Sequence, residues 1–545
     1  MIVMAVNLSH DGSVCVIDNG EVVFYQEEER ITHVKHTTGI MHSFAHAMDV
    51  YDPKEIIFVG AFPYELKVKD LFSNMMMAAG KWKHFSDNSG YNVHWLRDHH
   101  LAHATVAYYN SGFDKAGIVV VDGAGQAFTD SVGLYRESET IYEAHDNTIV
   151  TKHKNLITQY SSWDYSIQAM ELSTLQQFQK CSHRLPRDYT HTIYPSHLSL
   201  GKMFSAAGLK IFNSYHNAGK VMGLSAYGND NPEHQKAFID GVANPSILSS
   251  DISDEDLAYR VQHDSLDVSI NLIKHAIELS GSKNICLSGG YFLNCVNNYK
   301  YLKEFPDVNF YVEPNSSDSG TAIGAAMWLY NNITAKRPLP LDSLYLGEEA
   351  DYGLPLDAKG ISVSDASAND VAQLISDRNI VAMYQGKAES GPRALGNRSI
   401  LYDPRDPNGR DVVNTIKKRE YFRPFAGSVM VEHASEWFEM LSLKESPSMM
   451  YAVETKEKYK DTVPALQHND GTSRVQTVSS KQNHHYYNLI KEFYAITGVP
   501  MVLNTSFNLA GDTLVNDMKD AIRTCRESGI KYLYCPTISK MITVV

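Results

Sequence analysis

Residues 98–104 have the sequence Asp98-His99-His100-Leu101-Ala102-His103-Ala104. Three histidines fall within five positions, and no Gly or Pro follows until Gly112, so this stretch predicts the first turns of a helix. Side chains four positions apart lie on one face of a helix, so His99 and His103 can share one metal ion. Ordinary polar helix residues or hydrogen-bonded core histidines explain the same pattern. The metal hypothesis therefore requires further ligands elsewhere in the chain.

Two acidic residues in later segments are candidates for those ligands. The continuous apolar run at 116–125, AGIVVVDGAG, predicts a buried strand, and Asp122 stands at its end, where α/β proteins often carry sites. Asp318 lies in a Ser-rich stretch before TAIGAAMWLY (321–330), which predicts a helix of small residues. There Asp318 is either the N-cap of that helix or a fourth ligand.

The length and composition are typical of a globular protein with several domains. The chain has 545 residues, of which 43% are hydrophobic and 21% are charged. No apolar run approaches the ~20 residues that cross a bilayer, and we see no signal peptide, so we expect no membrane partner. The six cysteines are scattered without a CxxC pair, which favours the reducing cytoplasm as the location. The net charge of −14 disfavours nucleic acid by bulk electrostatics.

Glycine pairs and basic residues predict two places where a nucleotide or a phosphate can bind. Gly289 and Gly290 separate a predicted strand from a predicted helix, where backbone amides can approach a phosphate. After a proline-containing linker at 333–357, basic residues recur in a segment that predicts a compact α/β domain. Because arginine side chains hold phosphates bidentately, this domain predicts an anion-binding pocket.

Residues 150–198 are polar and irregular, and we expect them to form an insertion at the surface. Their aromatic residues are interleaved with basic ones, among them Lys180, Arg184 and Arg187. Such a mixture can bind a nucleic-acid strand through phosphate contacts and base stacking. A plain surface excursion explains the same composition.

A series of motifs along nearly the whole chain resembles the O-carbamoyltransferases of the NodU/CmcH type. The motifs, in order, are HDGS (10–13), EEER (27–30), HHLAHA (99–104), VDGAG (121–125), GKVMGLSAYG (219–228), CLSGGYFLNC (286–295), DSGTAIGAA (318–326), GPRALGNRSIL (391–401), KKREYFRPFAGS (417–428), SRVQTV (473–478) and LNTSFN (503–508). The resemblance implies an α/β protein with two catalytic domains. Residues 1–345 would have the actin/Hsp70-like ATPase fold, as does the enzyme that places threonylcarbamoyl on tRNA, and residues 346–545 would resemble YrdC.

The resemblance also implies an ATP-dependent reaction in two steps. The YrdC-like domain would join carbamoyl phosphate to ATP, with Mg²⁺ for the ATP, and form carbamoyladenylate while pyrophosphate and phosphate are released. The N-terminal domain would then transfer the carbamoyl group to an acceptor hydroxyl. A metal ion would assist this second step, and Fe(II) or another divalent transition metal suits two His and two carboxylate ligands.

The motifs imply a role for individual residues in both steps. The implied metal ligands are His99, His103, Asp122 and Asp318. The candidate general bases for the acceptor hydroxyl are His10 and His100. The implied nucleotide-binding residues are Lys202, Gly289, Gly290, Asn294, Arg419 and Arg423. The implied carbamoyl phosphate-binding residues are Arg393, Lys417, Arg474, Asn504 and Ser506, of which Arg393 and Lys417 would also be catalytic.

The sequence does not decide between two kinds of acceptor molecule. A hydroxymethyl pyrimidine in DNA is the leading candidate, because Lys180, Arg184 and Arg187 with their neighbouring aromatics could contact a strand. The net charge of −14 opposes this candidate. The alternative is a small natural product such as an antibiotic, a toxin or a sugar. A non-catalytic nucleotide-binding protein is a hypothesis of another class, disfavoured because both predicted sites keep their polar residues. A homodimer is a candidate assembly.

Overall fold

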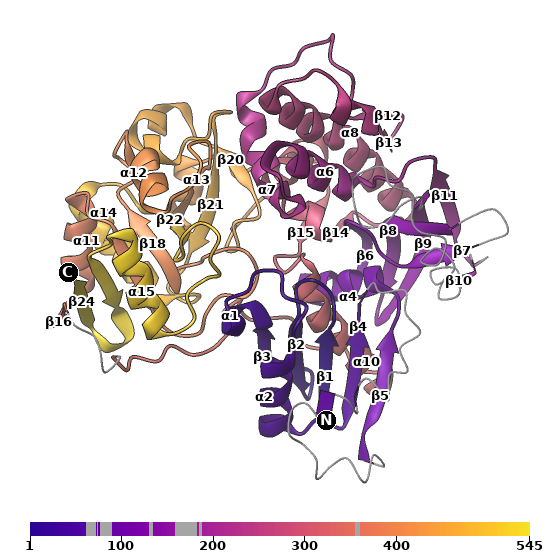
Figure 1. Cartoon of the computed structure of the whole chain (residues 1–545), viewed down its shortest axis with the longest axis horizontal. Coiled ribbons are helices and arrows are strands. Elements are labelled where there is room, and N and C mark those ends of the chain that lie inside the picture. Colours follow the sequence, from indigo (N-terminus) through magenta and orange to yellow (C-terminus); the bar gives the residue numbers. More distant parts are fainter. Residues whose placement is uncertain are drawn as a thin grey trace. The chain divides into compact units, whose positions relative to one another are not determined.

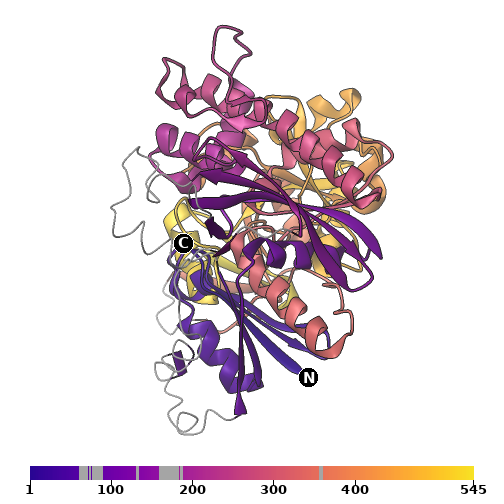
Figure 2. The ribbon, with the colours of Figure 1, turned by 90° about the vertical axis from the view of Figure 1, so that its right-hand side faces the viewer.

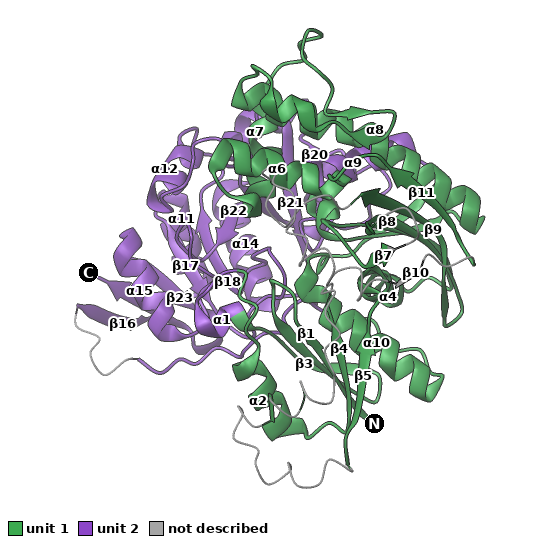
Figure 3. Ribbon diagram, turned by 45° about the vertical axis from the view of Figure 1, so that its right-hand side comes forward, with its two compact units in different colours: residues 1–28, 36–294, 307–341 green, residues 29–35, 295–306, 342–545 purple. Residues whose placement is uncertain are grey.

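The computed structural model describes residues 1–60, 72, 75–76, 90–129, 134–158, 183–184, 188–354 and 360–545. These residues form a mixed α/β protein, which confirms the predicted class, and they divide into two compact units (Figures 1 and 3). Unit 1 comprises residues 1–28, 36–294 and 307–341, and unit 2 comprises residues 29–35, 295–306 and 342–545. None of the helices in the described part of the chain combines the length and low polarity needed to cross a membrane.

The first sheet of unit 1 has five strands in the order β3-β2-β1-β4-β5. The strands are β1 (Ile2–Asn7), β2 (Ser13–Asp18), β3 (Glu21–Glu27), β4 (Glu55–Val59) and β5 (Asn92–Leu96). The first three are antiparallel neighbours, whereas β4 runs parallel to β1 and β5 runs parallel to β4. Asn19 and Gly20 between β2 and β3 have φ values of 49° and 94°, which a tight two-residue hairpin requires.

The second sheet of unit 1 repeats this arrangement. Its five central strands are β9 (Thr148–Thr158), β8 (Leu134–His145), β6 (Lys115–Val121), β14 (Asn284–Ser288) and β15 (Asn309–Val312). Again the first three are antiparallel neighbours, and the last two continue parallel to the first strand in sequence, β6. Unit 1 therefore contains an internal structural repeat, which the sequence patterns did not predict. Short strands β7 (Ala127–Thr129), β10 (His183–Arg184) and β11 (Thr190–Tyr194) extend the second sheet.

Two helices of unit 1 pack against each other and against the two sheets (Figure 2). Helix α4 (His99–Ser111) lies on the second sheet, and α10 (Thr321–Thr334) lies on the first. A Cβ atom at Gly324 would lie 2.0 Å from the carbonyl oxygen of Ala102, so this close approach needs glycine. Helix α2 (Met41–Tyr51) also packs on the first sheet and α8 (Asp254–Ser280) on the second. With helices packed on it, strand β6 is almost entirely buried, which explains its continuous apolar sequence.

The predicted insertion at 150–198 begins later than expected. Residues 148–158 form β9 within the second sheet, and β11 pairs with it. The polar residues of β9 misled the prediction because Lys154 and Asn155 are buried rather than exposed. The central part of the predicted insertion, residues 159–182 and 185–187, lies outside the described residues.

Unit 2 is built on a nine-stranded sheet with the order β16-β24-β23-β17-β18-β22-β19-β21-β20. The strands are β16 (Ile361–Asp365), β17 (Val381–Tyr384), β18 (Arg398–Tyr402), β19 (Ala426–Met430), β20 (Ala452–Glu454), β21 (Thr472–Val478), β22 (Met501–Ser506), β23 (Tyr532–Cys535) and β24 (Lys540–Val544). Its longer helices are α11 (Ala368–Ser376), α12 (Gly409–Ile416), α14 (His484–Thr497) and α15 (Met518–Ser528).

Two short segments from earlier in the chain also belong to unit 2. Helix α9 (Cys295–Glu304) packs beside β20, where the Tyr299 hydroxyl donates to the carbonyl oxygen of Glu439 at 2.8 Å. In the segment 29–35, the Arg30 guanidinium donates to the carbonyl oxygen of Gly391 at 3.0 Å. Unit 2 is therefore not continuous in sequence.

Candidate metal centre and anion pocket

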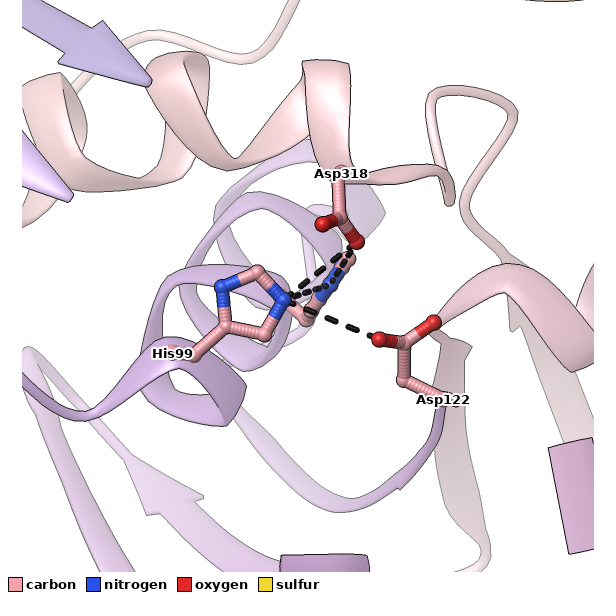
Figure 4. Close-up of side chains that lie close together, drawn as sticks. His99, Asp122 and Asp318 are labelled. Atoms are coloured by element: carbon pink, nitrogen blue, oxygen red, sulfur yellow. Dashed lines mark hydrogen bonds and ion pairs between the residues drawn. The ribbon is translucent and has the colours of Figure 1, made fainter. Parts of the chain in front are cut away.

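Four side chains of unit 1 gather around one point (Figure 4). His99 and His103 lie on α4, Asp122 directly follows β6, and Asp318 begins the short turn before α10. Each residue offers one donor atom, and these four atoms all lie within 4.8 Å of one another. The structure thus brings together the four residues that the family resemblance implied as metal ligands.

The distances within this group suit a shared cation. Nε2 of His99 lies 3.3 Å from a carboxylate oxygen of Asp318 and 3.7 Å from one of Asp122. Nε2 of His103 lies 3.7 Å from the same oxygen of Asp318 and 3.2 Å from Nε2 of His99. Both imidazoles are fully buried. Two buried ring nitrogens that converge with two carboxylates form a donor set that suits a divalent transition metal better than Mg²⁺ or Ca²⁺.

The electrostatics of the group also favour a positive charge at its centre. Burial lowers the pKa of His99, but Asp318 and Asp122 outweigh burial and raise it to about 10. Burial raises the pKa of Asp318, yet His99 and His10 hold it well below its usual range. Buried carboxylates that stay ionised need a cationic partner. The four residues therefore fit a divalent metal ion.

The two ligand imidazoles lack the hydrogen bond that often orients such rings. Nδ1 of His99 and Nδ1 of His103 are buried and have no hydrogen-bond partner within the described ranges. A ligating histidine usually donates this second nitrogen to a carboxylate or a carbonyl. The orientation of these rings must therefore come from how α4 itself is held.

A buried ion-pair network holds both α4 and the loop of Asp122. Lys154 of β9 is paired with Glu137 of β8, and it lies 3.1 Å from a carboxylate oxygen of Asp98. Asp98 is the N-cap of α4 and accepts a hydrogen bond from its first turn. Glu137 accepts a hydrogen bond of 2.9 Å from the backbone N–H of Gln126, in the loop that follows Asp122. The network thus connects the two elements that carry three of the four candidate ligands.

His100 is turned away from the candidate ligands. Its Nδ1 lies 2.8 Å from the hydroxyl of Thr140, and its Nε2 is buried without a partner among the described residues. A Cβ atom at Gly125 would lie 2.8 Å from that nitrogen, so the loop backbone covers it. Burial lowers the pKa of His100 to about 4. Because the ring is fully enclosed, His100 is poorly placed to receive a proton from an acceptor.

His10, the other candidate base, lies at the exposed side of the centre. Its side chain is 51% exposed, and Nδ1 lies 3.2 Å from a carboxylate oxygen of Asp318. The buried Asn7 side chain donates to the backbone oxygens of Asp11 at 2.8 Å and of Asp318 at 3.0 Å. This pair of hydrogen bonds fixes the His10 loop against the segment that carries Asp318.

The sequence did not predict a role for three side chains that surround His10. Asp11 lies 2.7 Å from Nδ1 of His36, and the ring of His36 stacks on that of His216. His36 follows the EEER motif at 27–30, and His216 precedes the GKVMGLSAYG motif at 219–228. The folded structure was needed to bring these residues beside His10.

Gly289 and Gly290 are packed closely against the end of β6. Gly289 has a φ of 96°, and a Cβ atom there would lie 2.2 Å from the carbonyl oxygen of Val121. The backbone N–H of Gly290 donates to a carboxylate oxygen of Asp122 at 3.2 Å. The glycine pair therefore allows the strand β14 to end beside a candidate metal ligand, and one of its amides already has an acceptor.

The other two predicted nucleotide-binding residues of unit 1 differ in their surroundings. Burial, with a contribution from Arg136, lowers the pKa of Lys202 to about 7, although Asp122 opposes this shift. The Asn294 side chain is buried, and its amide is paired with that of Gln262 by hydrogen bonds of 2.8 and 3.2 Å. Lys202 thus carries a titratable amine close to the metal centre, whereas Asn294 helps to hold α8.

Unit 2 contains a group of buried basic side chains whose positive charges lower one another's pKa. Burial lowers the pKa of Arg393 to about 9, and the charges of Arg474 and Arg423 contribute. Burial lowers the pKa of Arg419 to about 9 as well, with contributions from the same two arginines. Burial and neighbouring cations likewise hold the pKa of Lys417 well below its usual range. Buried positive charges that repel one another are stabilised by a bound anion, so these five residues fit an anion-binding site, and we call them the candidate anion pocket.

The end of β22 supplies the polar groups beside this pocket. The Lys417 ammonium donates to the backbone oxygen of Ser506 and, at 3.0 Å, to the side-chain oxygen of Asn508. Asn504 donates from its amide nitrogen to the backbone oxygen of Ala394 at 3.1 Å. Its amide oxygen is buried and has no hydrogen-bond partner in the part of the chain that is described. That oxygen is available to accept a hydrogen bond from a ligand amide.

The predicted acceptor-binding residues are not placed by the structure. Lys180 and Arg187 lie outside the described residues. Arg184 belongs to β10, which pairs with β7, but its side chain also lies outside what is described.

Comparisons with known proteins identify the family. Residues 372–540 match the family model described as Carbamoyltransferase C-terminus, and residues 233–327 match Carbamoyltransferase N-terminus. Nodulation protein NolNO of Sinorhizobium fredii is 28% identical over 94% of this chain and 76% of its own length. An uncharacterized protein of Methanocaldococcus jannaschii is 31% identical over 81% of this chain and 72% of its own length. The chain belongs to the carbamoyltransferase family.

The chain is thus an enzyme that transfers a carbamoyl group to an oxygen acceptor, as the motif resemblance implied.

Among solved structures, full-length HypF in its phosphate- and nucleotide-bound form is 12% identical with a TM-score of 0.38, over 62% of this chain and 56% of that chain. Component A of (R)-2-hydroxyglutaryl-CoA dehydratase from Acidaminococcus fermentans is 10% identical with a TM-score of 0.33, over 62% of this chain and 100% of that chain.

Proposed function

We propose that the enzyme makes carbamoyladenylate from ATP and carbamoyl phosphate in unit 2 and transfers its carbamoyl group at the metal centre of unit 1. The observation that carries this proposal is the convergence of four donor atoms within 4.8 Å in unit 1. The basic group in unit 2 supports it, because phosphate-bearing substrates need an anion pocket. A candidate cation site in one unit and a candidate anion site in the other suit a reaction in two steps.

In the first step, the anion pocket of unit 2 binds both co-substrates. Arg393, Lys417 and Arg474 hold carbamoyl phosphate, and Arg419 and Arg423 hold the phosphates of ATP, which enters with Mg²⁺. Water takes the phosphoryl group of carbamoyl phosphate, so that phosphate is released and carbamate remains. A carbamate oxygen then bonds to the α-phosphorus of ATP as pyrophosphate leaves. The arginine charges stabilise the negative charge that develops on the transferred groups. The buried amide oxygen of Asn504 accepts a hydrogen bond from the carbamoyl NH₂. Ser506 lies two positions after Asn504 on the same strand.

In the second step, the acceptor oxygen bonds to the carbamoyl carbon, and the bond from that carbon to AMP breaks. His10, rather than the enclosed His100, is placed to take the proton of the acceptor hydroxyl, because the His10 side chain is exposed. Burial lowers the pKa of His10, but Asp318 and Asp11 outweigh burial and raise it to about 10, so His10 acts as a base only when a cation held by Asp318 offsets that charge. Lys202 offsets the charge of the departing AMP. When bound by His99, His103, Asp122 and Asp318, an Fe(II) or similar ion would polarise the carbamoyl carbonyl as a Lewis acid.

We assign unit 1 to the actin/Hsp70-like fold and unit 2 to the YrdC-like fold. The repeated sheets of unit 1 support the first assignment, since a duplicated mixed sheet suits a two-lobed ATPase. The anion pocket beside β22 of unit 2 supports the second assignment.

For the acceptor, we propose a hydroxymethyl pyrimidine in DNA, with a small natural product as the alternative. The interleaved basic and aromatic residues at 150–198 support DNA. The net charge of −14 supports the alternative. Mass analysis of nucleosides from hydroxymethylated DNA, incubated with the enzyme and both co-substrates, distinguishes them. A carbamoylated nucleoside is expected, and an unchanged nucleoside profile would favour the small molecule.

The first step is tested by incubating the enzyme with ATP and carbamoyl phosphate alone. Carbamoyladenylate and pyrophosphate should form, and both products can be followed by mass spectrometry and a coupled assay. Arg474→Met removes one charge of the anion pocket and should lower the release of pyrophosphate about 10²-fold. Arg526→Met changes an exposed arginine of α15 in unit 2 and should release pyrophosphate as the wild type does. No release by the wild-type enzyme would refute the proposed function.

A further inference from the structure

Three side chains with rings lie next to one another, and two of them lie near His10; we call the three the ring wall. Tyr215 and His216 belong to the short turn η3 (Tyr215–Asn217) that follows α6 (Leu200–Phe212), and His36 follows α1 (Glu28–Thr32). The rings of His36 and His216 are stacked, with centroids 4.0 Å apart and planes 7° apart. The ring of Tyr215 lies 4.3 Å from that of His216. The ring of His10 lies nearly parallel to both histidines, at 6.1 and 6.0 Å.

The position of His36 is fixed by the loop that carries His10. Nδ1 of His36 lies 2.7 Å from a carboxylate oxygen of Asp11. The backbone N–H of Gly12 donates to the carbonyl oxygen of Thr37 at 2.9 Å. A Cβ atom at Gly12 would lie 2.3 Å from the carbonyl oxygen of Gly39, so the two segments fit together only with glycine. The ring wall is therefore a built feature of unit 1.

The ring wall is exposed and adjoins the proposed transfer site. Tyr215 is 48% exposed, and the side chain of His36 is 36% exposed. His10 connects the wall to the metal centre, since its Nδ1 lies 3.2 Å from Asp318. Exposed rings of this size often mark a binding surface, because they combine apolar faces with polar edges.

The chemistry of the wall favours a neutral ring as its ligand. Burial, with contributions from the charges of His36 and His10, lowers the pKa of His216 to about 4. His216 is then uncharged at neutral pH, and its face offers stacking rather than attraction for an anion. Aromatic faces bind flat nucleobases by stacking, and they bind the C–H face of a sugar ring by the same apolar contact.

We propose that Tyr215, His216 and His36 bind the ring of the acceptor and so direct its hydroxyl group to His10. The acceptor class is a neutral ring that carries a hydroxyl or hydroxymethyl group, which a pyrimidine and a pyranose both satisfy. This inference rests on the proposed function, because it assumes that transfer occurs beside His10. An acyclic alcohol has no ring face and should bind weakly.

Saturation-transfer NMR on the complete enzyme tests this inference with three probes: hydroxymethyldeoxycytidine, methyl glucoside and glycerol. At least one of the two ring probes should receive saturation at its ring protons, and glycerol should receive little. His216→Ala should weaken binding of that probe about tenfold, whereas His216→Phe keeps a ring face and should retain it. Tyr215→Ala gives a second variant at an exposed position. His484→Ala, an exposed histidine of unit 2, serves as the matched control and should bind as the wild type does.

The outcomes distinguish a pyrimidine acceptor from a sugar acceptor. They also distinguish failure of the ring-binding inference from failure of the proposed function. Binding of the nucleoside alone assigns a pyrimidine acceptor, and binding of the glucoside alone assigns a sugar. The inference is overturned if neither ring probe binds better than glycerol, or if both alanine variants bind like the wild type. Pyrophosphate release by the wild-type enzyme is measured in parallel. Release without ring binding leaves the proposed function standing, and absence of release refutes the proposed function together with this inference.

Discussion

At the scale of single residues, the chemistry of unit 1 depends on how His99 and His103 acquire their partners. Their spacing places them on one face of α4, but two histidines on a helix do not make a site. Asp122 and Asp318 come from elements far away in sequence and complete the donor set. The Asp318 carboxylate is not needed as a helix cap, because Ser317 and Gly320 occupy the cap positions next to it.

Asp122→Asn should weaken metal binding at least tenfold, because an amide is a much poorer ligand than a carboxylate and leaves one charge less at the centre. Metal content after dialysis, measured by plasma mass spectrometry, and titration calorimetry with Fe(II) or Mn²⁺ report this change. Asp114→Asn is the matched control, since Asp114 lies next to the other end of β6 with a fully exposed side chain. Equal metal content in Asp122→Asn and the wild type would contradict the assignment.

Local rules predicted some of these residues and missed others. The i, i+4 rule found His99 and His103, and the strand-end rule found Asp122. Asp318 needed the family resemblance, because an acidic residue before a helix is equally well explained as a cap. His36 and His216 lay beyond both rules, since their stacking depends on how distant loops fold together.

At the scale of elements, the Lys154–Glu137–Asp98 network determines where α4 and the Asp122 loop sit. Lys154 is fully enclosed in a strand whose polar sequence suggested a surface excursion. Strand β6 was predictable because its continuous apolar sequence reports burial directly. Strand β9 was not, because burial of paired charges leaves no apolar pattern.

Glu137→Gln should destabilise the metal-free enzyme by about 3 to 5 kcal/mol at pH 7, because it leaves Lys154 buried with one partner less. Burial raises the pKa of Glu137, but Lys154 and His100 lower it further, from 4.5 to about 2. A folded-state pKa below the unfolded value gives stability that is present above about pH 4.5 and lost as the pH falls toward 2. The difference between variant and wild type should therefore be smaller at pH 3.5 than at pH 7.

Urea unfolding in the presence of a chelator, at both pH values, measures this difference. Glu143→Gln on the same strand changes a half-buried carboxylate that pairs with Lys152, and it should cost less than about 1 kcal/mol. A deficit of Glu137→Gln that stays constant between the two pH values would show that the ion pair is not its cause.

Gly324→Ala should destabilise unit 1 by about 1 to 3 kcal/mol, because the new Cβ would lie 2.0 Å from the Ala102 carbonyl oxygen and would push α10 from α4. Gly219→Ala is the matched control, since Gly219 is also helical and a Cβ there meets nothing within 4 Å. The control should gain up to about 1 kcal/mol from its helix propensity. Thermal unfolding of the two variants compares them, and similar transition temperatures would argue against the close packing of these helices.

At the scale of the whole molecule, the internal repeat of unit 1 explains the layout of its site. The His10 loop follows the first strand of the first sheet, and Asp122 follows the first strand of the second. Likewise α4 follows the last strand of the first sheet, and the turn of Asp318 and α10 follow the last strand of the second. The site therefore collects equivalent segments of the two repeats.

This organisation could be predicted from the sequence only in part. The order of strands and helices followed from local patterns, whereas the repeat did not, because the two halves share strand order without a shared motif. The main boundary was expected at 345/346 and the two units divide at 341/342, but two short earlier segments were not expected to belong to unit 2. The segments 29–35 and 295–306 belong to unit 2 through contacts such as that of Tyr299 with Glu439. No sequence pattern in or near these segments predicts such contacts.

The central claim is that two units perform two successive steps, and the most direct measurement follows both steps in single-site variants. Pyrophosphate release and transfer from labelled carbamoyl phosphate, onto hydroxymethylated DNA or methyl glucoside, are recorded for Asp122→Asn and Arg474→Met. We expect Asp122→Asn to release pyrophosphate but to transfer no carbamoyl group, and we expect Arg474→Met to be about 10²-fold slower in both reactions. Loss of pyrophosphate release in folded Asp122→Asn, or transfer by Arg474→Met at the wild-type rate, would contradict the account.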